Sequence, residues 1–219
     1  MKIQSRFQWN MGEFVDIGRV ATPDAPLRCA QLISGTGSGM EAMLRAQSLP
    51  TASHTTVVVI SNQPDATGIQ RAQQYNVPTH VIDHTNISRE EHELQIIELL
   101  SSYHVELVIL SGYMRLLSLT FIRAFEGRII NIHPSLLPQF PGAHAHRDVI
   151  QSDVKFSGCT VHLVDEGMDT GPILAQCPVP RLEDDDESRL ARRVRVEEHR
   201  VYPQVVEAIS KGQRFHEVV

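Results

Sequence analysis

Short apolar runs alternate with helical segments along the first 130 residues of the chain. The runs are rich in β-branched and aliphatic residues, which is typical of buried strands, and they fall at 29–34, 56–60, 80–82, 107–110 and 128–132. Segments with a helical pattern lie between them, at 40–47, 67–75, 88–103 and 118–124. The third of these is the clearest, because Leu94, Ile97 and Leu100 recur at helical spacing after Ser88, which can cap the helix. This alternation predicts a parallel, doubly wound α/β sheet.

The pattern changes after residue 133. A helix is predicted at 142–152, followed by two strands at 160–164 and 173–179 that an Asp-rich turn joins. We expect these two strands to be antiparallel additions to the sheet. Acidic residues at 184–187 indicate a helix start, where the helix dipole favours negative charge, and we interpret them as a solvated run. That helix should extend to about Arg200, break or kink at Pro203, and be followed by a last helix to Lys211.

Length and composition favour one soluble domain. A chain of 219 residues can bury a substantial core, and 42% hydrophobic with 21% charged residues is ordinary for a globular protein. No apolar run reaches the ~20 residues that a membrane helix needs. The net charge of -6 argues against nucleic acid as a partner, because phosphate contacts require clustered Lys and Arg. We expect a monomer or homodimer that binds small molecules and neither a membrane nor nucleic acid.

Three cysteines, Cys29, Cys159 and Cys177, lack the paired spacing of a metal site. They are typical of buried, reduced thiols, so we expect a cytoplasmic protein.

Residues 1–26 stand apart from the predicted domain, which we place at 27–219. They mix acidic and basic residues and lack the apolar region of a secretory signal. They are either a peripheral extension that packs Phe7, Trp9 and Phe14 against the domain or a segment upstream of the true start codon.

Three polar side chains have the chemistry of acyl transfer. Asn131 and His133 lie two residues apart on a predicted strand, so their side chains leave the same face of it. An amide and a protonated imidazole can donate hydrogen bonds to the oxyanion that forms when an amine attacks a carbonyl. Asp169, in the turn between the last two strands, is the candidate carboxylate that orients the imidazole and favours its charged form. A single His or Asp is more often structural, and it is the whole set that indicates an active site.

A glycine-rich turn, Gly-Thr-Gly-Ser-Gly at 35–39, follows the first strand and precedes a helix. Glycines let the backbone approach a ligand closely, and the free N–H groups of a helix start attract phosphate. The turn lacks the third glycine of the dinucleotide fingerprint, so it is a weak indication of an NAD site. It predicts either a phosphate site or a turn that only connects strand to helix.

The runs RIINIHPSLLPQFPG at 128–142 and GCTVHLVDEGMDTGPI at 158–173 closely resemble the phosphoribosylglycinamide formyltransferases (GAR transformylases) of de novo purine synthesis. The resemblance extends from about Arg28 to about Val206. It implies a Rossmann-like α/β fold, mostly parallel, and formyl transfer from the co-substrate 10-formyltetrahydrofolate to the amine of GAR, with no metal. It further implies that Asn131 holds the formyl oxygen, that His133 is the general acid and that Asp169 keeps His133 protonated and positioned.

The same resemblance divides the domain into a phosphate-binding half at about 27–127 and a catalytic and folate-binding half at about 128–219. The GAR site is expected at Gly37, Ser38, Gly39, Arg195, Val196, Glu197 and Glu198. The folate site is expected at Arg89, Met114, Arg115, Leu116, Leu117, Asn131, Asp165, Glu166, Gly167, Met168 and Asp169.

Two of these positions depart from the family's pattern. Gly39 stands where Asn is usual, which removes a side-chain contact with the phosphate, and Arg195 stands where some members carry Gln. Arg89, Arg195 and Glu198 could equally be solvated helix charges, which are common.

Three other histidines are open to more than one interpretation. His144 and His146 are separated by one residue with no cysteine nearby, which is a poor set for zinc, so packing or contact with a substrate edge is favoured. His162 lies two residues from Thr160 on a predicted strand, and it either faces the pocket or is structural.

Three other functions are compatible with parts of this pattern. A 10-formyltetrahydrofolate hydrolase has a similar Asn-His-Asp centre, but that family normally carries a longer N-terminal regulatory domain and lacks the phosphate loop. A transformylase that acts on charged tRNA would need a basic surface and a nucleic-acid-binding domain. A module that only binds nucleotides would not require Asn131, His133 and Asp169 together.

Overall fold

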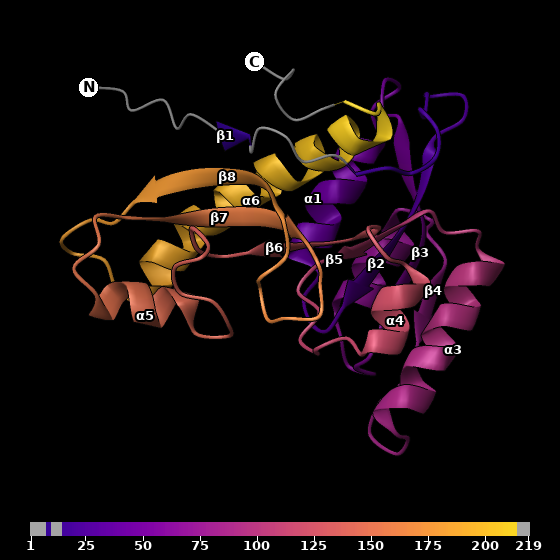
Figure 1. Ribbon diagram of the computed structural model, residues 1–219, viewed down its shortest axis with the longest axis horizontal. Coiled ribbons are helices and arrows are strands. Elements are labelled where there is room, and N and C mark those ends of the chain that lie inside the picture. The colour runs from indigo at the N-terminus through magenta and orange to yellow at the C-terminus, as the bar shows by residue number, and fades with distance from the viewer. Residues whose placement is uncertain (1–7, 10–14, 214–219) are drawn as a thin grey trace.

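The computed structural model describes residues 8–9 and 15–213 of the 219-residue chain. Within this part, one eight-stranded sheet has the strand order β1-β8-β7-β6-β5-β2-β3-β4 (Figure 1). Strands β2 to β6 pair in parallel, whereas β7, β8 and β1 join the sheet in antiparallel fashion. In chain order the strands are β1 (Gln8–Trp9), β2 (Leu27–Ile33), β3 (His54–Ser61), β4 (Thr79–Val81), β5 (Leu107–Leu110), β6 (Ile129–His133), β7 (Phe156–Leu163) and β8 (Ile173–Pro180).

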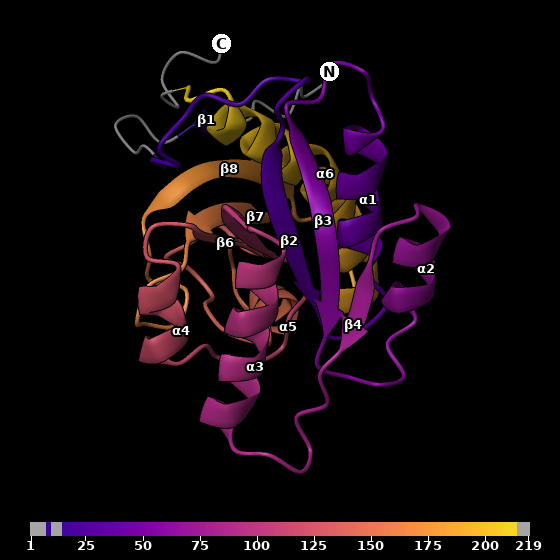
Figure 2. The same ribbon diagram turned by 90° about the vertical axis from the view of Figure 1, so that its right-hand side faces the viewer.

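The helices of the described ranges flank this sheet. They are α1 (Ser38–Gln47), α2 (Gly68–Gln74), α3 (Arg89–Ser102), α4 (Leu119–Ala124), α5 (Ala145–Gln151) and α6 (Glu187–Ser210). Helices α3 and α4 cover one face, and α1, α2 and α6 cover the other (Figure 2). This arrangement confirms the predicted α/β fold, in which antiparallel strands follow a parallel sheet. Over the same ranges, no helix is both long and apolar enough to cross a membrane.

Side chains of the central strands alternate between the two faces. Leu107 and Ile109 of β5 pack with α6, whereas Val108 and Leu110 pack with α3 and α4. Because helices cover both faces of a parallel sheet, such a strand is apolar throughout. That is why an unbroken apolar run was sufficient to predict it.

Strand β7 begins earlier than predicted. The sequence indicated a start at Thr160, but the strand starts at Phe156. Gly158 is a poor strand former, yet it lies opposite Pro178 of β8, and a Cβ there would come within 2.2 Å of the carbonyl oxygen of Cys177. Pairing with a neighbouring strand therefore decides the start of β7, and local propensity does not.

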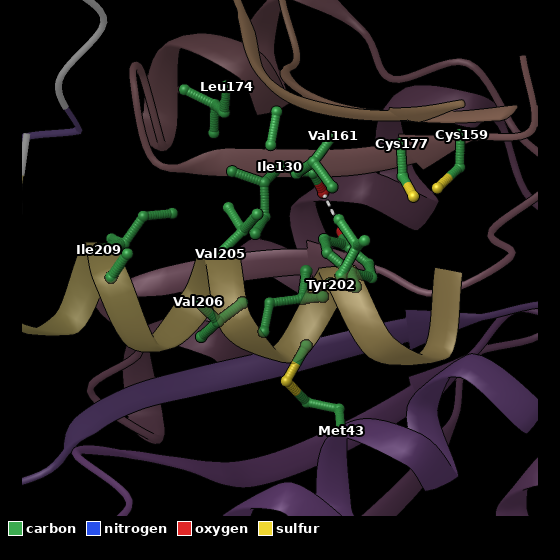
Figure 3. Close-up of a cluster of buried hydrophobic side chains, with 14 of the residues drawn as sticks. Met43, Ile130, Cys159, Val161, Leu174, Cys177, Tyr202, Val205, Val206 and Ile209 are labelled. Carbon is green, nitrogen blue, oxygen red and sulfur yellow. Dashed lines mark hydrogen bonds between the residues drawn. The ribbon is translucent and has the colours of Figure 1, made fainter. Parts of the chain in front are cut away.

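Helix α6 passes through Pro203 without ending, so the predicted helix end near Arg200 is wrong. A proline removes one backbone hydrogen bond of a helix. The residues around it compensate, because Tyr202, Val205, Val206 and Ile209 are each at most 2% exposed and pack against the sheet (Figure 3). Burial of four large side chains stabilises the helix by more than one lost hydrogen bond costs.

The acidic run before α6 is only partly a solvated helix start. Asp186 caps the helix by accepting a hydrogen bond from the backbone N–H of Arg189 (2.7 Å). The carboxylate of Asp185 is instead buried in an ion pair with Arg193, and the hydrogen bond from that guanidinium lowers the pKa of Asp185. The predicted solvation is therefore wrong for Asp185, whose charge has a fixed partner.

The segment 15–26 packs into the domain. Val15 and Ala21 are buried in the core beneath α6, and the backbone N–H of Ala21 donates to the carbonyl of Ser210. Arg19 forms a two-pronged ion pair with Glu106 at 2.6 and 2.7 Å. The N-terminal extension therefore belongs to the folded unit from Val15 onward.

The prediction for this extension also concerned the packing of three aromatic residues, Phe7, Trp9 and Phe14. Trp9 belongs to β1, whose backbone pairs with β8, while Phe7 and Phe14 lie outside the described residues.

Candidate active site

A cavity of about 960 Å³ opens at the carboxyl ends of β2, β5 and β6. These strands are parallel neighbours, so the loops that follow them meet at one edge of the sheet, where open α/β sheets bind ligands. The loop between β7 and β8 folds over the same region. The wall of the cavity is built from 35–39, 110–119, 131–134 and 164–169 and from one face of α6.

Asn131, His133 and Asp169 all line this cavity. His133 Nδ1 lies 3.3 Å from Asp169 Oδ2, and the two side chains are only 6% and 13% exposed. The same carboxylate oxygen accepts a hydrogen bond from the backbone N–H of Gly142 at 2.8 Å. The carboxylate is thus fixed by an imidazole on one side and a backbone donor on the other.

The loop that carries Asp169 is closed by its own side chains. Asp165 Oδ1 accepts hydrogen bonds from the backbone N–H of Gly167 (3.0 Å) and from Thr170 Oγ1 (2.8 Å). At Gly171 a Cβ would lie 1.9 Å from the carbonyl oxygen of Leu163, so only glycine fits. Asp169 itself has a left-handed backbone, with φ of 55°, which Asp adopts more readily than most residues. The sequence of this turn therefore directs the Asp169 carboxylate toward β6.

Both ring nitrogens of His133 face hydrogen-bond acceptors. Nε2 lies 2.8 Å from the carbonyl oxygen of Phe140, and Nδ1 faces Asp169. A ring with one N–H can donate to only one of these acceptors, whereas a ring with an N–H on each nitrogen can donate to both. The turn that supplies the Phe140 carbonyl is held by Ser135, whose own carbonyl accepts a hydrogen bond from Thr160 Oγ1 at 2.6 Å.

His162 completes the polar cluster, a role that sequence reasoning left undecided. It lies directly opposite Asn131 in the antiparallel pair of β6 and β7. Its Nδ1 lies 2.8 Å from the carbonyl oxygen of Leu163, which assigns the proton to that nitrogen. Its Nε2 therefore accepts from Asn131 Nδ2 at 3.2 Å and fixes the direction of that amide. Burial lowers the pKa of His162, which favours this neutral form.

The glycine turn 35–39 forms the wall next to α1. Gly37 has a left-handed backbone, with φ of 68°, and packs against Gly68 at the start of α2. A Cβ on Gly68 would lie 2.9 Å from the Gly35 carbonyl oxygen and 3.1 Å from Gly37 Cα, and the backbone N–H of Gly68 donates to that carbonyl at 3.0 Å. Helix α2 therefore supports the turn from behind, and only glycine permits such a close approach. At Gly39 a Cβ would meet nothing within 4 Å, so a larger side chain would fit there.

The loop after β5 forms another part of the wall. It carries large apolar side chains into solvent at the cavity mouth, where Met114 is 70% exposed. Exposed apolar side chains that gather around a cavity are typical of a ligand site. The residues of this loop that line the cavity include the four predicted to bind folate, Met114, Arg115, Leu116 and Leu117, and the β7–β8 loop adds Asp165, Glu166, Gly167 and Met168.

Arg89 lines the cavity as well, and it also holds the β5 loop in place. Its guanidinium donates to the carbonyl of Leu116 at 2.6 Å. One turn further along α3, the buried carboxylate of Glu93 accepts a hydrogen bond from the backbone N–H of Ser118 at 2.9 Å. The start of α3 therefore clamps the loop that carries the predicted folate contacts.

One face of α6 lines the cavity at intervals of three or four residues, as a helix requires. Arg195 and Glu198 lie on this face, as predicted. Val196 and Glu197 do not: Val196 is 65% exposed outside the cavity, and Glu197 pairs with Arg200 at 2.7 Å. Residues one or two positions after Arg195 lie on other faces of the helix, so the assignment of Val196 and Glu197 to the substrate site stays a prediction that the lining of the cavity does not support.

The carboxyl group of Glu198 is placed where its charge is poorly solvated. Burial raises the pKa of Glu198 to about 7, although the positive charge of Arg195 opposes that rise. A carboxyl group of this kind changes its charge near neutral pH, which is characteristic of functional sites.

The sequence model for the family described as Formyl transferase matches residues 27–206. This chain belongs to the formyl transferase family. Phosphoribosylglycinamide formyltransferase of Escherichia coli (strain K12) is 37% identical over 188 residues, which cover 85% of this chain and 89% of that protein. The trifunctional purine biosynthetic protein adenosine-3 of Drosophila melanogaster is 44% identical over 188 residues, but this chain spans only 14% of its length. The crystal structure of phosphoribosylglycinamide formyltransferase from Brucella melitensis has a TM-score of 0.82 at 44% identity and covers 86% of this chain and 97% of that chain.

The cavity of this formyl transferase also contains residues that were not predicted. His199 and Tyr202 follow Glu198 on the same face of α6, a position that helical spacing from Arg195 could have indicated. His146, for which packing or contact with a substrate edge was expected, also lines the cavity, and its Nδ1 is buried without a hydrogen-bond partner among the described residues. Within the same ranges, no group of three or more His, Cys, Asp or Glu is arranged to hold a metal ion.

Gly68→Ala should displace the glycine turn while preserving the fold. The new methyl group would lie 2.6 Å from Ile33 Cδ1, a side-chain end that can shift, and 2.9 and 3.1 Å from backbone atoms of Gly35 and Gly37, so the turn must also move. We expect the Kd for GAR, the substrate predicted for this turn, to rise about tenfold, which corresponds to roughly 1.4 kcal/mol. Calorimetric titration measures this, and binding of 10-formyltetrahydrofolate, whose predicted contacts include the β7–β8 loop, serves as the internal control. An equal rise in the Kd values for GAR and for 10-formyltetrahydrofolate would contradict an effect confined to the glycine turn.

Proposed function

We propose that this chain transfers the formyl group of 10-formyltetrahydrofolate to the amine of GAR, giving formyl-GAR and tetrahydrofolate in de novo purine synthesis. The observation that carries this proposal is the His133–Asp169 pair beside Asn131, in a cavity that the glycine turn and the β5 loop also line. The similarity to phosphoribosylglycinamide formyltransferases, over most of the length of both chains, supports the same reaction.

The chemistry of the cavity suits both substrates. Its volume of about 960 Å³ is near the upper end of the ~300–1,000 Å³ usual for ligand pockets. The glycine turn and the guanidinium of Arg195 can receive a phosphate group. The apolar side chain of Met114 and the charge of Arg89 suit an aromatic folate with an acidic tail.

In the proposed reaction the neutral amine of GAR attacks the formyl carbon, and the resulting oxyanion is stabilised by Asn131. The amide Nδ2 has two hydrogens, and His162 accepts only one of them. The second is available to the oxyanion, where a preoriented donor stabilises developing charge. Binding both substrates in one cavity supplies much of the remaining rate enhancement, because the reaction becomes effectively intramolecular.

His133 would act in the proton transfers that complete the reaction. The new C–N bond forms on the amine of GAR, the bond to the folate nitrogen breaks, and one proton moves from the first nitrogen to the second. His133 could donate through Nε2 once a substrate displaces the Phe140 carbonyl, while Asp169 keeps its contact with Nδ1. Water or the imidazole would carry the proton, and no covalent enzyme intermediate is needed.

A formyltetrahydrofolate hydrolase would use water in place of the amine. Hydrolysis does not require a glycine turn and an arginine in the cavity that Asn131, His133 and Asp169 also line. These two features favour an acceptor that carries a phosphate.

The three cysteines fit the proposed cytoplasmic location. Cys29, Cys159 and Cys177 are all buried and free, and burial raises the pKa of the Cys177 thiol to about 11, which makes it unreactive. Such thiols are compatible with a reducing compartment.

The acceptor is tested by following 10-formyltetrahydrofolate consumption with and without GAR. We expect consumption to require GAR and to yield one formyl-GAR per tetrahydrofolate, detected by mass spectrometry. Related phosphoribosyl amines serve as competing acceptors. Equal consumption without GAR would reject the proposal in favour of the hydrolase.

Asp169→Asn should remove catalysis and leave the fold and ligand binding intact. The change preserves the shape of the side chain and tolerates the left-handed backbone, but it removes the negative charge that faces His133. We expect kcat to fall at least about 100-fold, because the imidazole loses its charged partner. Circular dichroism and calorimetric titration check fold and binding. Wild-type turnover in this variant would exclude Asp169 from the mechanism.

GAR binding should weaken as the pH falls through 7. The Glu198 carboxyl, with a pKa near 7, is ionised above that pH and protonated below it, so a hydrogen bond that it accepts from GAR is lost at low pH. We expect the KM for GAR to rise up to about tenfold from pH 8 to pH 6, since one pKa unit corresponds to a factor of ten. Steady-state kinetics across this range provide the measurement.

The phosphate of GAR also titrates near pH 6, so a matched variant is needed. Glu198→Gln cannot ionise and should show a high KM that changes little between pH 8 and pH 7. A wild-type dependence in this variant would assign the titration to the substrate.

A further inference from the structure

Tyr202 connects three parts of the cavity that come from different elements. It lies on the face of α6 that carries Arg195 and Glu198, seven and four residues before it, and it lines the cavity with them. Its ring is buried in the core with Ile130 and Val205 (Figure 3). The side chain therefore reaches from the predicted substrate face of the helix into the sheet.

The hydroxyl of Tyr202 donates to two backbone carbonyls. It lies 2.9 Å from the oxygen of Ile130, a bond drawn in Figure 3, and 3.2 Å from the oxygen of Leu110, so its one proton is shared. Ile130 directly precedes Asn131 on β6, and Leu110 is the last residue of β5. The pairing of these two strands ends at Leu110 and Asn131. The hydroxyl therefore joins the strands where they separate to form the cavity.

This hydroxyl remains a donor at any working pH. Burial raises the pKa of Tyr202 well above its ordinary value of 10. Without the hydroxyl, two carbonyls next to the cavity would lose their shared donor, and a buried polar group that loses a partner is destabilised. The two strand ends would then be held less firmly against α6.

We propose that Tyr202 is a positioning residue for formyl transfer. Its hydroxyl holds Asn131 and the loop after β5 at a fixed distance from Arg195 and Glu198 on α6. This inference rests on the proposed function, which assigns the phosphoribosyl substrate to α6 and folate to that loop. A misplacement of ~1 Å between reacting groups can cost about 100-fold in rate. Loss of one shared hydrogen bond should move the strands by less than this distance, so we expect kcat to fall only about tenfold.

Tyr202→Phe tests the proposal, because it removes the hydroxyl and keeps the ring. The matched control is Tyr103→Phe, which removes a hydroxyl that lies 3.0 Å from His80 Nε2, outside the cavity. We expect Tyr202→Phe to lower kcat about tenfold while both KM values change by less than about threefold. Tyr103→Phe should lose stability and keep the wild-type kcat. A wild-type kcat in Tyr202→Phe, or an equal fall in both variants, overturns the proposal.

Amide hydrogen exchange gives a second measurement that does not depend on activity. In Tyr202→Phe the amides at 111–113 and 131–132 should exchange faster, whereas those of β3 should not. Unchanged exchange at those amides overturns the proposal even if kcat falls. If the wild-type chain does not formylate GAR, the proposed function fails, and exchange still decides whether the hydroxyl holds the two strands. Should the variant be unstable, saturating folate at low temperature favours its folded state for both measurements.

Discussion

The parallel pairing of β2, β5 and β6 is the constraint on which the site depends. Parallel neighbours end at the same edge of a sheet, so their following loops converge without any special contact between them. The glycine turn, the clamped loop after β5 and the polar end of β6 are brought together in this way. Asp169 reaches the site in a different way, because it lies in the loop between the antiparallel strands β7 and β8. Its loop folds back over β6, and the side chain of Asp165 closes that loop.

Backbone groups, as well as contacts among the side chains themselves, hold the polar side chains of the site in place. The N–H of Gly142 fixes Asp169, the carbonyl of Phe140 holds His133, and the carbonyl of Leu163 sets the tautomer of His162. These backbone atoms are themselves fixed by the sheet and its turns. Rigid supports of this kind keep a catalytic group in its productive geometry at little entropic cost during the reaction.

The parts of the fold that sequence reasoning predicted are those encoded by local patterns. The apolar run of β5 is unbroken because both of its faces are buried, and Ser88 caps α3 through its own side chain. The chemistry of Asn131, His133 and Asp169 was also apparent, because the three residue types together suit acyl transfer and the runs around them resemble a known family. A lone His and Asp would not have been sufficient.

The features that were missed or left undecided depend on contacts between distant residues. His162 faces Asn131 only because of the register between β6 and β7, which no local pattern shows. Helix α6 continues through Pro203 because the sheet buries its far half, and Arg19 pairs with a glutamate 87 positions away. Val196 and Glu197 were assigned with Arg195 as one block of sequence, although a helix turns neighbouring residues in different directions.

The left-handed backbone at Asp169 narrows the set of residues that could ever occupy that position. Asparagine and glycine accept this conformation but bring no charge, and glutamate brings the charge on a longer side chain without the same backbone tolerance. Among the twenty amino acids only aspartate satisfies both demands at the length that reaches His133. A substitute at this position must therefore accept the backbone conformation and also carry the negative charge. A residue that meets only one of these requirements does not replace Asp169.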